Sequence, residues 1–358
     1  MHFPILSGIA LASVLAPAIA HPELVDHSKV PRHEVHHLNS RSTGACKVQI
    51  EARRQATAAK RGAKARTRRE ARGVSDSHAL SDRSIYETIP NRTCILAPET
   101  VWGPYGIDNE LHRHDVRESQ SGINLYLDIG LIDVETCEPL PDAWLTIWAC
   151  NATGSYSGFT GIDPDTSDLL SGFEKRTDGT TDDKTFLRGI SKTDSEGMTE
   201  FLTIFPGYYI SRTTHIHVTV QTNVTGKDTS YNQASVQHLG QLFFEEELIN
   251  SVYQLQPYKD HLSTLNRTTN AEDSLYSTAN SDGYSAVVST ALLGHVIADG
   301  LVGSITIGVN RSATPAETTG GSVNVVGYLP TASPTAGAQA AAYVIDAEEG
   351  YFEKRRKL

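Results

Sequence analysis

Short β-prone apolar runs alternate with turn-forming residues along the middle of this chain. The runs cover residues 124–133, 143–149, 199–204, 215–221, 241–244 and 302–308. Glycine, proline, asparagine and aspartate cluster between them, as in the Asp-Ser-Glu-Gly segment at residues 194–197, which is typical of a hairpin connection. This alternation predicts an all-β sandwich or barrel. Residues 245–258 are more helical in pattern, and the stretch from there to residue 284 is polar and loop-like.

The two ends of the chain differ from this middle region. Residues 1–20 are apolar and end in Ala-Ile-Ala, a pattern typical of a secretory signal peptide with its cleavage site. Residues 21–92 are polar and basic, and within them the Ala- and Arg-rich residues 45–72 favour helix. Residues 312–358 begin with a Thr-, Ala-, Gly-, Ser- and Pro-rich stretch and predict a disordered low-complexity tail. We therefore expect one folded domain over residues 93–311.

Charge and modification motifs narrow the possible classes of protein. A formal net charge of −11 argues against general nucleic-acid binding. No segment after residue 20 is long and apolar enough to span a membrane. Several Asn-x-Ser/Thr sequons, together with the expected signal peptide, predict a secreted glycoprotein. The sequons begin at Asn91, Asn151, Asn223, Asn266 and Asn310.

In the oxidising compartment that a secretory signal peptide implies, some of the cysteines are expected to pair. After removal of a signal peptide the chain keeps Cys46, Cys94, Cys137 and Cys150. At about 3.3 Å per residue, the expected strand before Cys150 spans about 20 Å, which disfavours a bridge from Cys137 to Cys150. Among the possible connectivities this favours a Cys46–Cys94 bridge. The sequence has no Cys-x-x-Cys motif, so a thiolate zinc site has no support.

A His-x-His motif opens one of the β-prone runs. His215 and His217 follow a turn that carries Tyr209 and Arg212. Side chains alternate between the two faces of a strand, so both imidazoles are expected on one face, with Ile216 on the other. Two such histidines beside a tyrosine can bind one metal ion. The alternative is a strand with two ordinary polar histidines facing solvent, because the motif is short and common.

A second candidate segment follows the run that ends near Trp148. A glycine-bearing turn comes next, and Tyr156 is expected to project from the loop. Tyr156 then joins Tyr209, His215 and His217 in a set of two tyrosines and two histidines. The sequence near His215 shows no His-x-Asp/Glu triad of the kind that ferrous oxygenases use.

In these segments the sequence resembles the intradiol ring-cleavage dioxygenases, the group that contains protocatechuate 3,4-dioxygenase and catechol 1,2-dioxygenase. The resemblance runs from about Thr93 to about Arg311, is nearest to the secreted fungal members, and rests on the order and spacing of short motifs. The motifs are Gly103-Pro104-Tyr105, Arg113-His114-Asp115-Val116-Arg117, Cys137-Glu138-Pro139, residues 147–156, Phe186-Leu187-Arg188-Gly189, Asp194 with Gly197, Thr203-Ile204-Phe205-Pro206-Gly207, Arg212, His215-Ile216-His217 and Gly240-Gln241.

The resemblance implies a β-sandwich core of the intradiol dioxygenase type and one non-haem Fe(III) per chain. The family's iron ligands fall on Tyr156, Tyr209, His215 and His217, and Tyr208 then points the other way into packing. The chemistry of these four residues agrees with the iron-ligand assignment that the resemblance implies. A free phenol has a pKa of about 10, and a trivalent cation is a strong enough local charge to displace its proton.

The resemblance also implies a reaction. The partners would be O2 and a small catechol-type aromatic diol, cleaved between its two hydroxylated carbons to a muconate-type diacid. Tyr209 would take a proton from the diol, and Arg212 would stabilise anionic character that develops on the ring. The substrate-binding residues would be Gly103, Pro104, Tyr105, Arg212 and Gln241. This chain departs from the family pattern at two positions: it has Trp102 where relatives commonly carry a glutamate and Gly106 where they commonly carry a second aromatic. Arg188 is expected to be structural.

The residues themselves also allow two other hypotheses about function. One is a non-catalytic secreted β-sandwich that binds an aromatic or glycan ligand. The other is a zinc hydrolase that uses the same histidines, although no carboxylate or cysteine stands at suitable spacing from His215 and His217. Oligomeric state is also open, with a homodimer among the options.

Overall fold

The computed structural model describes residues 105–107, 110–164, 176, 180–210, 212–221, 224–227, 230–232, 236–281 and 285–312. The expected signal peptide, the expected N-terminal helix, and all but the first residue of the expected C-terminal tail lie outside these residues. Gly103 and Pro104 also lie outside them.

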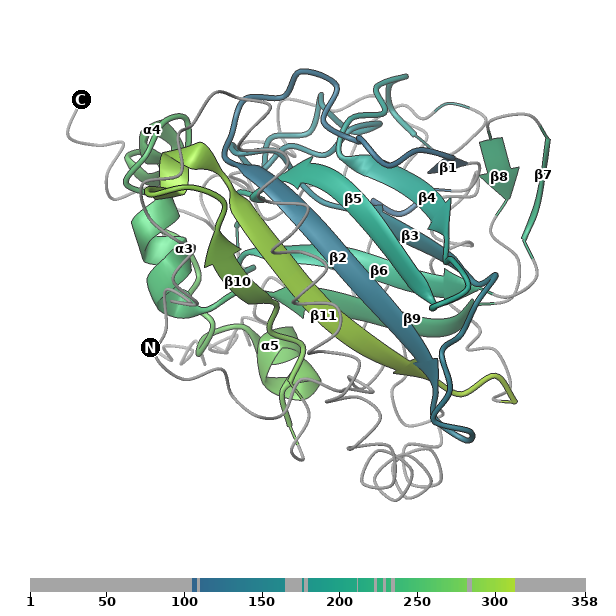
Figure 1. Cartoon of the computed structure of the whole chain (residues 1–358). Coiled ribbons are helices and arrows are strands. Elements are labelled where there is room, and N and C mark those ends of the chain that lie inside the picture. Colours follow the sequence, from purple (N-terminus) through teal and green to yellow (C-terminus); the bar gives the residue numbers. More distant parts are fainter. Residues whose placement is uncertain are drawn as a thin grey trace, which may run out of the picture.

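Two four-stranded sheets lie face to face and form the body of the molecule (Figure 1). The first has the order β10-β11-β2-β5, and its strands are β2 (Asn124–Asp133), β5 (Met198–Ile204), β10 (Ser289–Leu292) and β11 (Leu301–Val309). The second has the order β4-β3-β6-β9, and its strands are β3 (Trp144–Trp148), β4 (Arg188–Lys192), β6 (His215–Gln221) and β9 (Val236–Phe243). The predicted all-β sandwich is confirmed for the described part of the chain.

Smaller elements surround the sandwich. A three-stranded sheet joins β1 (Glu110–Leu111), β8 (Ser230–Asn232) and β7 (Thr225–Lys227). The helical elements are α3 (Glu246–Val252), α4 (Tyr258–Leu262), α5 (Ser274–Ala279) and the 3-10 turn η1 (Ile297–Asp299). The helical pattern over residues 245–258 is confirmed by α3. The loop-like expectation for the following stretch is wrong where α4 and α5 form. None of the helices in the described ranges is long and apolar enough to cross a membrane.

Strand alternation explains which side chains of the second sheet form the core. Ile216, Val218 and Val220 of β6 belong to the main hydrophobic cluster, together with alternate residues of β2 such as Leu125 and Leu127. The intervening residues of β6 therefore point to the opposite face of the sheet. That face is covered as well, because every residue of β6 is buried.

Register brings three residues of neighbouring strands side by side on this second face. Trp148 of β3 pairs with His217 of β6, and His217 pairs in turn with Gln241 of β9. Both pairings are antiparallel, so the three side chains project to the same side of the sheet. The chain thereby aligns residues that are far apart in sequence.

The cysteines correct one prediction. Cys137 is disulfide-bonded, and Cys150 is a buried free thiol. The expected absence of a Cys137–Cys150 bridge is confirmed. With Cys150 free, the partner of Cys137 must be Cys46 or Cys94. The predicted Cys46–Cys94 bridge is therefore wrong.

Candidate active site

Four polar side chains converge on the face of β6 that lies opposite Ile216, Val218 and Val220. The Nε2 atom of His215 lies 3.5 Å from Tyr156 Oη, 3.4 Å from Tyr209 Oη and 3.2 Å from His217 Nε2. All four side chains are at least 98% buried. The reading in which His215 and His217 face solvent is therefore wrong, because the covering loops exclude solvent from that face.

The two histidines are held by different neighbours. The Nδ1 atom of His215 lies 2.7 Å from the carbonyl oxygen of Thr213, so Nδ1 carries the proton and donates it. The lone pair of Nε2 is then directed into the cluster, the orientation that a metal-binding imidazole needs. The ring of His217 stacks on Trp148, with centroids 4.7 Å apart and planes 4° apart.

Tyr156 lies on the loop that follows β3. The Asn151 side-chain oxygen accepts hydrogen bonds from the backbone N–H groups of Thr153 and Ser155, which shapes this loop. The Tyr156 ring stacks on Tyr105, with centroids 4.4 Å apart and planes 17° apart. Tyr105, expected at the wall of a substrate pocket, therefore lies directly against one of the four converging side chains.

Arg188 ties that region to the sheet. Its guanidinium donates to Ser157 Oγ at 2.7 Å, to the Tyr105 carbonyl at 2.9 Å and to Glu110 Oε1 at 3.1 Å. Arg188 and Glu110 are each 1% exposed. The expected structural role of Arg188 agrees with these contacts, since two of them hold Ser157 and Tyr105, which are neighbours of Tyr156.

The loop that carries Tyr209 packs tightly against the loop that carries Tyr156. A Cβ atom at Gly207 would lie only 2.4 Å from the Asn151 carbonyl oxygen, and one at Gly154 would lie 2.3 Å from the Tyr208 carbonyl oxygen. Only glycine permits this approach of two backbones. Tyr208 points away from the cluster as expected: its hydroxyl donates to the Leu265 carbonyl at 2.6 Å.

Burial sets the protonation of these groups. It raises the pKa of Tyr156 well above its usual value, and it also raises the pKa of Tyr209, although Arg212 acts in the opposite direction. Burial, followed by the charge of Arg212, lowers the pKa of His215 to about 3. At neutral pH the protein alone therefore holds neutral phenols and a neutral His215 at this place.

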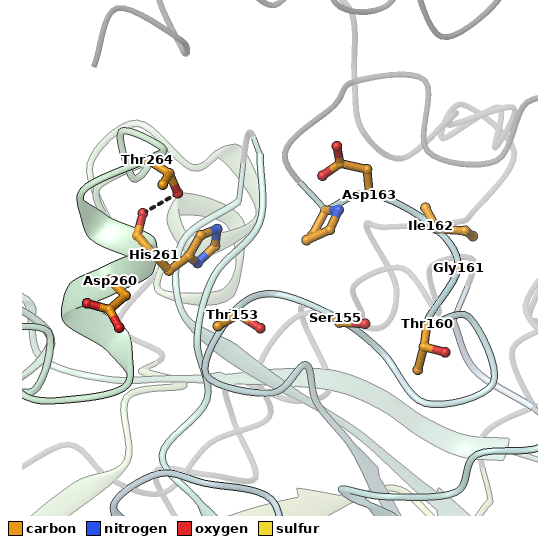
Figure 2. Close-up of a pocket in the computed structure, with 10 residues that line it drawn as sticks. Thr153, Ser155, Thr160, Gly161, Ile162, Asp163, Asp260, His261 and Thr264 are labelled. Atoms are coloured by element: carbon orange, nitrogen blue, oxygen red, sulfur yellow. Dashed lines mark hydrogen bonds between the residues drawn. The ribbon is translucent and has the colours of Figure 1, made fainter. Parts of the chain in front are cut away.

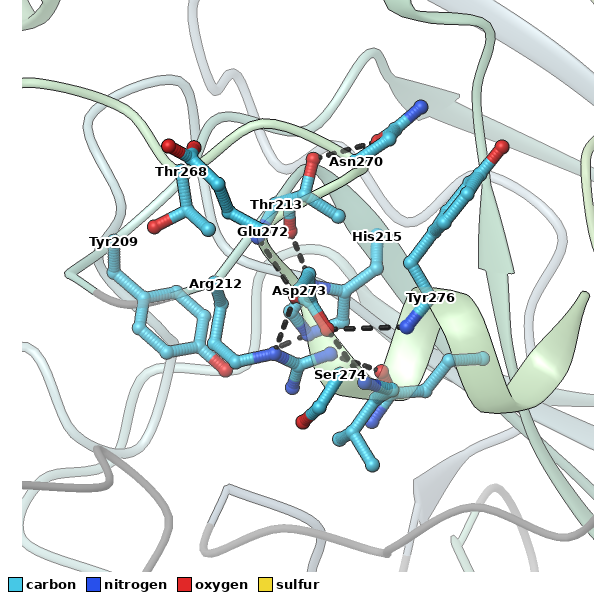
Figure 3. A network of polar contacts seen from close by, with 12 residues as sticks. Tyr209, Arg212, Thr213, His215, Thr268, Asn270, Glu272, Asp273, Ser274 and Tyr276 are labelled. Atoms are coloured by element: carbon cyan, nitrogen blue, oxygen red, sulfur yellow. Dashed lines mark hydrogen bonds and ion pairs between the residues drawn. The ribbon is translucent and has the colours of Figure 1, made fainter. Parts of the chain in front are cut away.

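A buried ion pair lies beside the cluster (Figure 3). Arg212 Nε donates to Asp273 Oδ2 at 2.8 Å, and Arg212 Nη2 donates to Gln241 Oε1 at 2.5 Å. Burial acts to raise the pKa of Asp273, but the charge and hydrogen bonds of Arg212 outweigh it and the pKa is lowered. The Gln241 Nε2 atom lies 3.5 Å from His217 Nδ1, so the guanidinium connects to the histidines through this amide.

The separations around His215 Nε2 have the dimensions of a metal site. Four donors held at about 2.0–2.1 Å from a transition-metal ion, as for zinc, would lie about 3.3 Å apart in a tetrahedral arrangement. The separations of 3.2, 3.4 and 3.5 Å around His215 Nε2 match this spacing. Within the described ranges, no group of three or more His, Cys, Asp or Glu residues is arranged to hold a metal ion. The tyrosine oxygens are thus needed to complete a metal-binding set here.

An open groove of about 480 Å³ has Ser155, the chain neighbour of Tyr156, in its lining (Figure 2). It runs between α4 and the loop of residues 153–164, and its lining includes Ser155, Asp163 and His261. His261 stacks on Tyr208, with centroids 4.5 Å apart. The groove is therefore lined by neighbours of the tyrosines and not by the four converging side chains.

The structure brings together the sequence-predicted residues Tyr105, Tyr156, Tyr209, Arg212, His215, His217 and Gln241. Sequence reasoning assigned no role to Asp273 or Thr213, which touch Arg212 and His215. Asp273 has a local sequence signal as the N-cap of α5. Its contact with Arg212 has none, because the two residues are 61 positions apart.

Comparison with known proteins identifies the family. No family model and no curated protein sequence matches the chain. Among solved structures, an intradiol ring-cleavage dioxygenase from Tetranychus urticae is 30% identical, with a TM-score of 0.51, covering 62% of this chain and 98% of that one. A second solved structure, described as a dioxygenase, is 29% identical with a TM-score of 0.50 and the same coverage. The chain therefore belongs to the intradiol ring-cleavage dioxygenases, which are oxidoreductases.

Proposed function

We propose that this protein holds one non-haem Fe(III) and cleaves a small catechol-type diol with O2 between its two hydroxylated carbons, giving a muconate-type diacid. The observation that carries the proposal is that Tyr156 Oη, Tyr209 Oη and His217 Nε2 all lie within 3.5 Å of His215 Nε2. Family membership supports ring cleavage of catechol-type compounds in general. The alternative of a non-catalytic binding protein gives no reason for burying four such side chains together.

Tyr156, Tyr209, His215 and His217 would hold the ion. Bound Fe(III) would supply Lewis-acid chemistry toward the diol. Phenolate oxygens and imidazoles suit iron, and two phenolates offset two of its three positive charges. The raised pKa of both phenols means that their ionisation depends on such a cation, since burial alone keeps them protonated.

The chain's own residues would then perform three tasks. Tyr209 Oη would take a proton from a hydroxyl of the diol, because Arg212 favours its ionised form. The guanidinium of Arg212, 5% exposed, would stabilise negative charge that develops on the ring. Tyr105, which stacks on Tyr156, would form a wall that keeps water from the reacting carbons.

We also propose that the protein is secreted. The supporting features are the apolar residues 1–20 and the sequons, with residues 93–311 as the catalytic domain between a basic leader and a low-complexity tail. N-terminal sequencing of the protein recovered from the medium of a eukaryotic host tests this. A mature protein that begins near residue 21 agrees with the proposal, and retention of residues 1–20 contradicts it.

The first experiment on the reaction is a visible spectrum and an iron assay of the same purified sample. We expect one iron per chain, a broad tyrosinate-to-Fe(III) absorption, and a shift of that absorption when catechol is added. Tyr209→Phe should weaken the absorption and abolish turnover. Tyr208→Phe is the matched control, because it removes a neighbouring buried hydroxyl that bonds to Leu265 and not to the cluster.

Either of two results would contradict the proposal. A wild-type protein that stays colourless after ferric loading would favour the alternative hypothesis of a non-catalytic binding protein. Equal loss of colour in Tyr208→Phe and Tyr209→Phe would show that the colour reports general packing and not ligation by Tyr209.

A further inference from the structure

Asp273 is a buried carboxylate for which the reaction above provides no role. It is 2% exposed and caps α5, where Oδ1 accepts from the N–H groups of Leu275 at 2.8 Å and Tyr276 at 3.1 Å. Its other oxygen, Oδ2, accepts from Arg212 Nε at 2.8 Å and from Thr213 N at 2.9 Å. One side chain thus joins a helix N-terminus to the segment that leads into His215 (Figure 3).

The first connection from Asp273 runs through the guanidinium. Asp273 fixes the Nε end of Arg212, and the Nη2 end donates to Gln241 Oε1. The guanidinium is planar and its donors are fixed relative to one another, so a contact at one end orients the other. Gln241 in turn lies beside His217 Nδ1 at 3.5 Å. Asp273 therefore sets the direction of Arg212 and, through it, the position of the Gln241 amide.

The second connection runs through the backbone. The Thr213 N–H is held by Asp273 Oδ2, and the Thr213 carbonyl accepts from His215 Nδ1 at 2.7 Å. The Thr213 hydroxyl donates to Asn270 Oδ1 at 2.8 Å, which adds a second point of attachment to the same loop. The carbonyl that orients His215 is therefore immobilised from the segment that holds Asp273.

We propose that Asp273 is a positioning residue that holds Arg212 and His215 in their working orientations through these two connections. The inference rests on the proposed iron site. Partners of this kind, which orient a metal ligand without touching the metal, typically contribute about 10–100-fold to metal affinity or activity. Asp273 acts on a histidine and on the guanidinium at once, so its loss affects both iron affinity and turnover.

The test uses Asp273→Asn with Glu272→Gln as its matched control. An amide keeps one oxygen, and Asn caps a helix about as well as Asp, so α5 retains its cap. The amide NH2 group cannot accept from Arg212 Nε or Thr213 N, so both connections are broken. Glu272→Gln removes the same charge one residue away, from an exposed side chain that accepts hydrogen bonds from the N–H and the hydroxyl of Thr269.

Iron affinity, measured by competition with a ferric chelator, is the principal readout. We expect Asp273→Asn to bind iron about 10–100-fold more weakly than wild type and to lose turnover by a similar factor, while Glu272→Gln matches wild type. Thermal unfolding of the iron-free proteins checks that the variants are folded. Iron affinity of Asp273→Asn equal to that of Glu272→Gln would overturn the proposal.

A second variant separates the two connections and remains informative if Asp273→Asn does not fold. Arg212→Lys keeps a positive charge beside Asp273, but an ammonium group cannot bridge Asp273 and Gln241 as the guanidinium does. The Thr213 connection stays intact, so turnover should fall while iron affinity stays close to that of wild type. Iron affinity reduced by tenfold or more in Arg212→Lys would contradict the assignment of His215 to the Thr213 connection.

The two proposals fail in different ways. A wild-type protein that takes up no iron refutes the proposed function, and the positioning role falls with it. A coloured and active wild-type protein whose Asp273→Asn variant keeps full iron affinity refutes the positioning role alone.

Discussion

Replacement of Glu110 by glutamine tests whether the buried pair with Arg188 stabilises the loop that carries Tyr156. The Glu110 carboxylate lies 3.1 Å from Arg188 Nη1, and each side chain is 1% exposed. Removing one partner of a buried pair leaves the other charge without its counter-ion and typically costs about 3–5 kcal/mol. In a domain of this size each kcal/mol lowers Tm by about 2–4 °C, so we expect Glu110→Gln to unfold about 6–20 °C earlier.

The matched control is Asp142→Asn. Asp142 pairs with Lys192 at 2.7 Å, but the two side chains are 78% and 44% exposed, so this ion pair contributes about 0–1 kcal/mol. Asparagine also tolerates the positive φ of 60° found at this position. Thermal unfolding of the iron-free proteins by circular dichroism is the assay. If Glu110→Gln and Asp142→Asn lower Tm by the same small amount, the buried pair does not stabilise the fold as reasoned here.

Three further outcomes are expected. Gly207→Ala should lose iron and colour, measured by an iron assay and visible absorption, because its Cβ would lie 2.4 Å from the Asn151 carbonyl oxygen and force the two tyrosine loops apart. Cys150→Ala should keep iron and turnover, and the wild-type thiol should resist alkylation at pH 8 in a mass-spectrometric assay, because burial raises its pKa to about 12. His238 should make the iron-free protein less stable in acid, because burial lowers its pKa from 6.5 to about 4: its contribution is complete above about pH 6.5 and is lost as pH falls through 4. Between about pH 6.5 and 4, His238→Phe should reduce the pH dependence of the free energy of unfolding by up to about 1.4 kcal/mol per pH unit, as measured by urea unfolding.

Local periodicity explains what the sequence could predict. The alternation of His215, Ile216 and His217 places both imidazoles on one face of a strand wherever that strand lies. The turn signals between β-prone runs likewise predicted a sandwich without any knowledge of which strands pair. Those features depend on neighbours along the chain, so one sequence is enough to predict them.

Features set by distant contacts were missed or wrong. The polar stretch after residue 258 gave no sign that Asp273 would be buried against Arg212, because burial of a carboxylate depends on a partner 61 positions away. The disulfide prediction was wrong for the same reason. Four cysteines allow three connectivities, and the spacing along the chain argued against only the Cys137–Cys150 bond. The solvent-facing alternative for His215 was open until the covering loops were known.

The charges of the site explain why these distant contacts matter for the proposed chemistry. Arg212 and Asp273 form a buried pair with no net charge, so the guanidinium alone is not enough to ionise the two tyrosines. Burial holds both phenols above their usual pKa, and His215 stays neutral. Any negative charge on Tyr156 and Tyr209 must then be matched by a cation bound between them. A divalent ion with two phenolates would have no net charge, whereas a trivalent ion would retain one positive charge that could balance an anionic diol, and this favours Fe(III) for the proposed site.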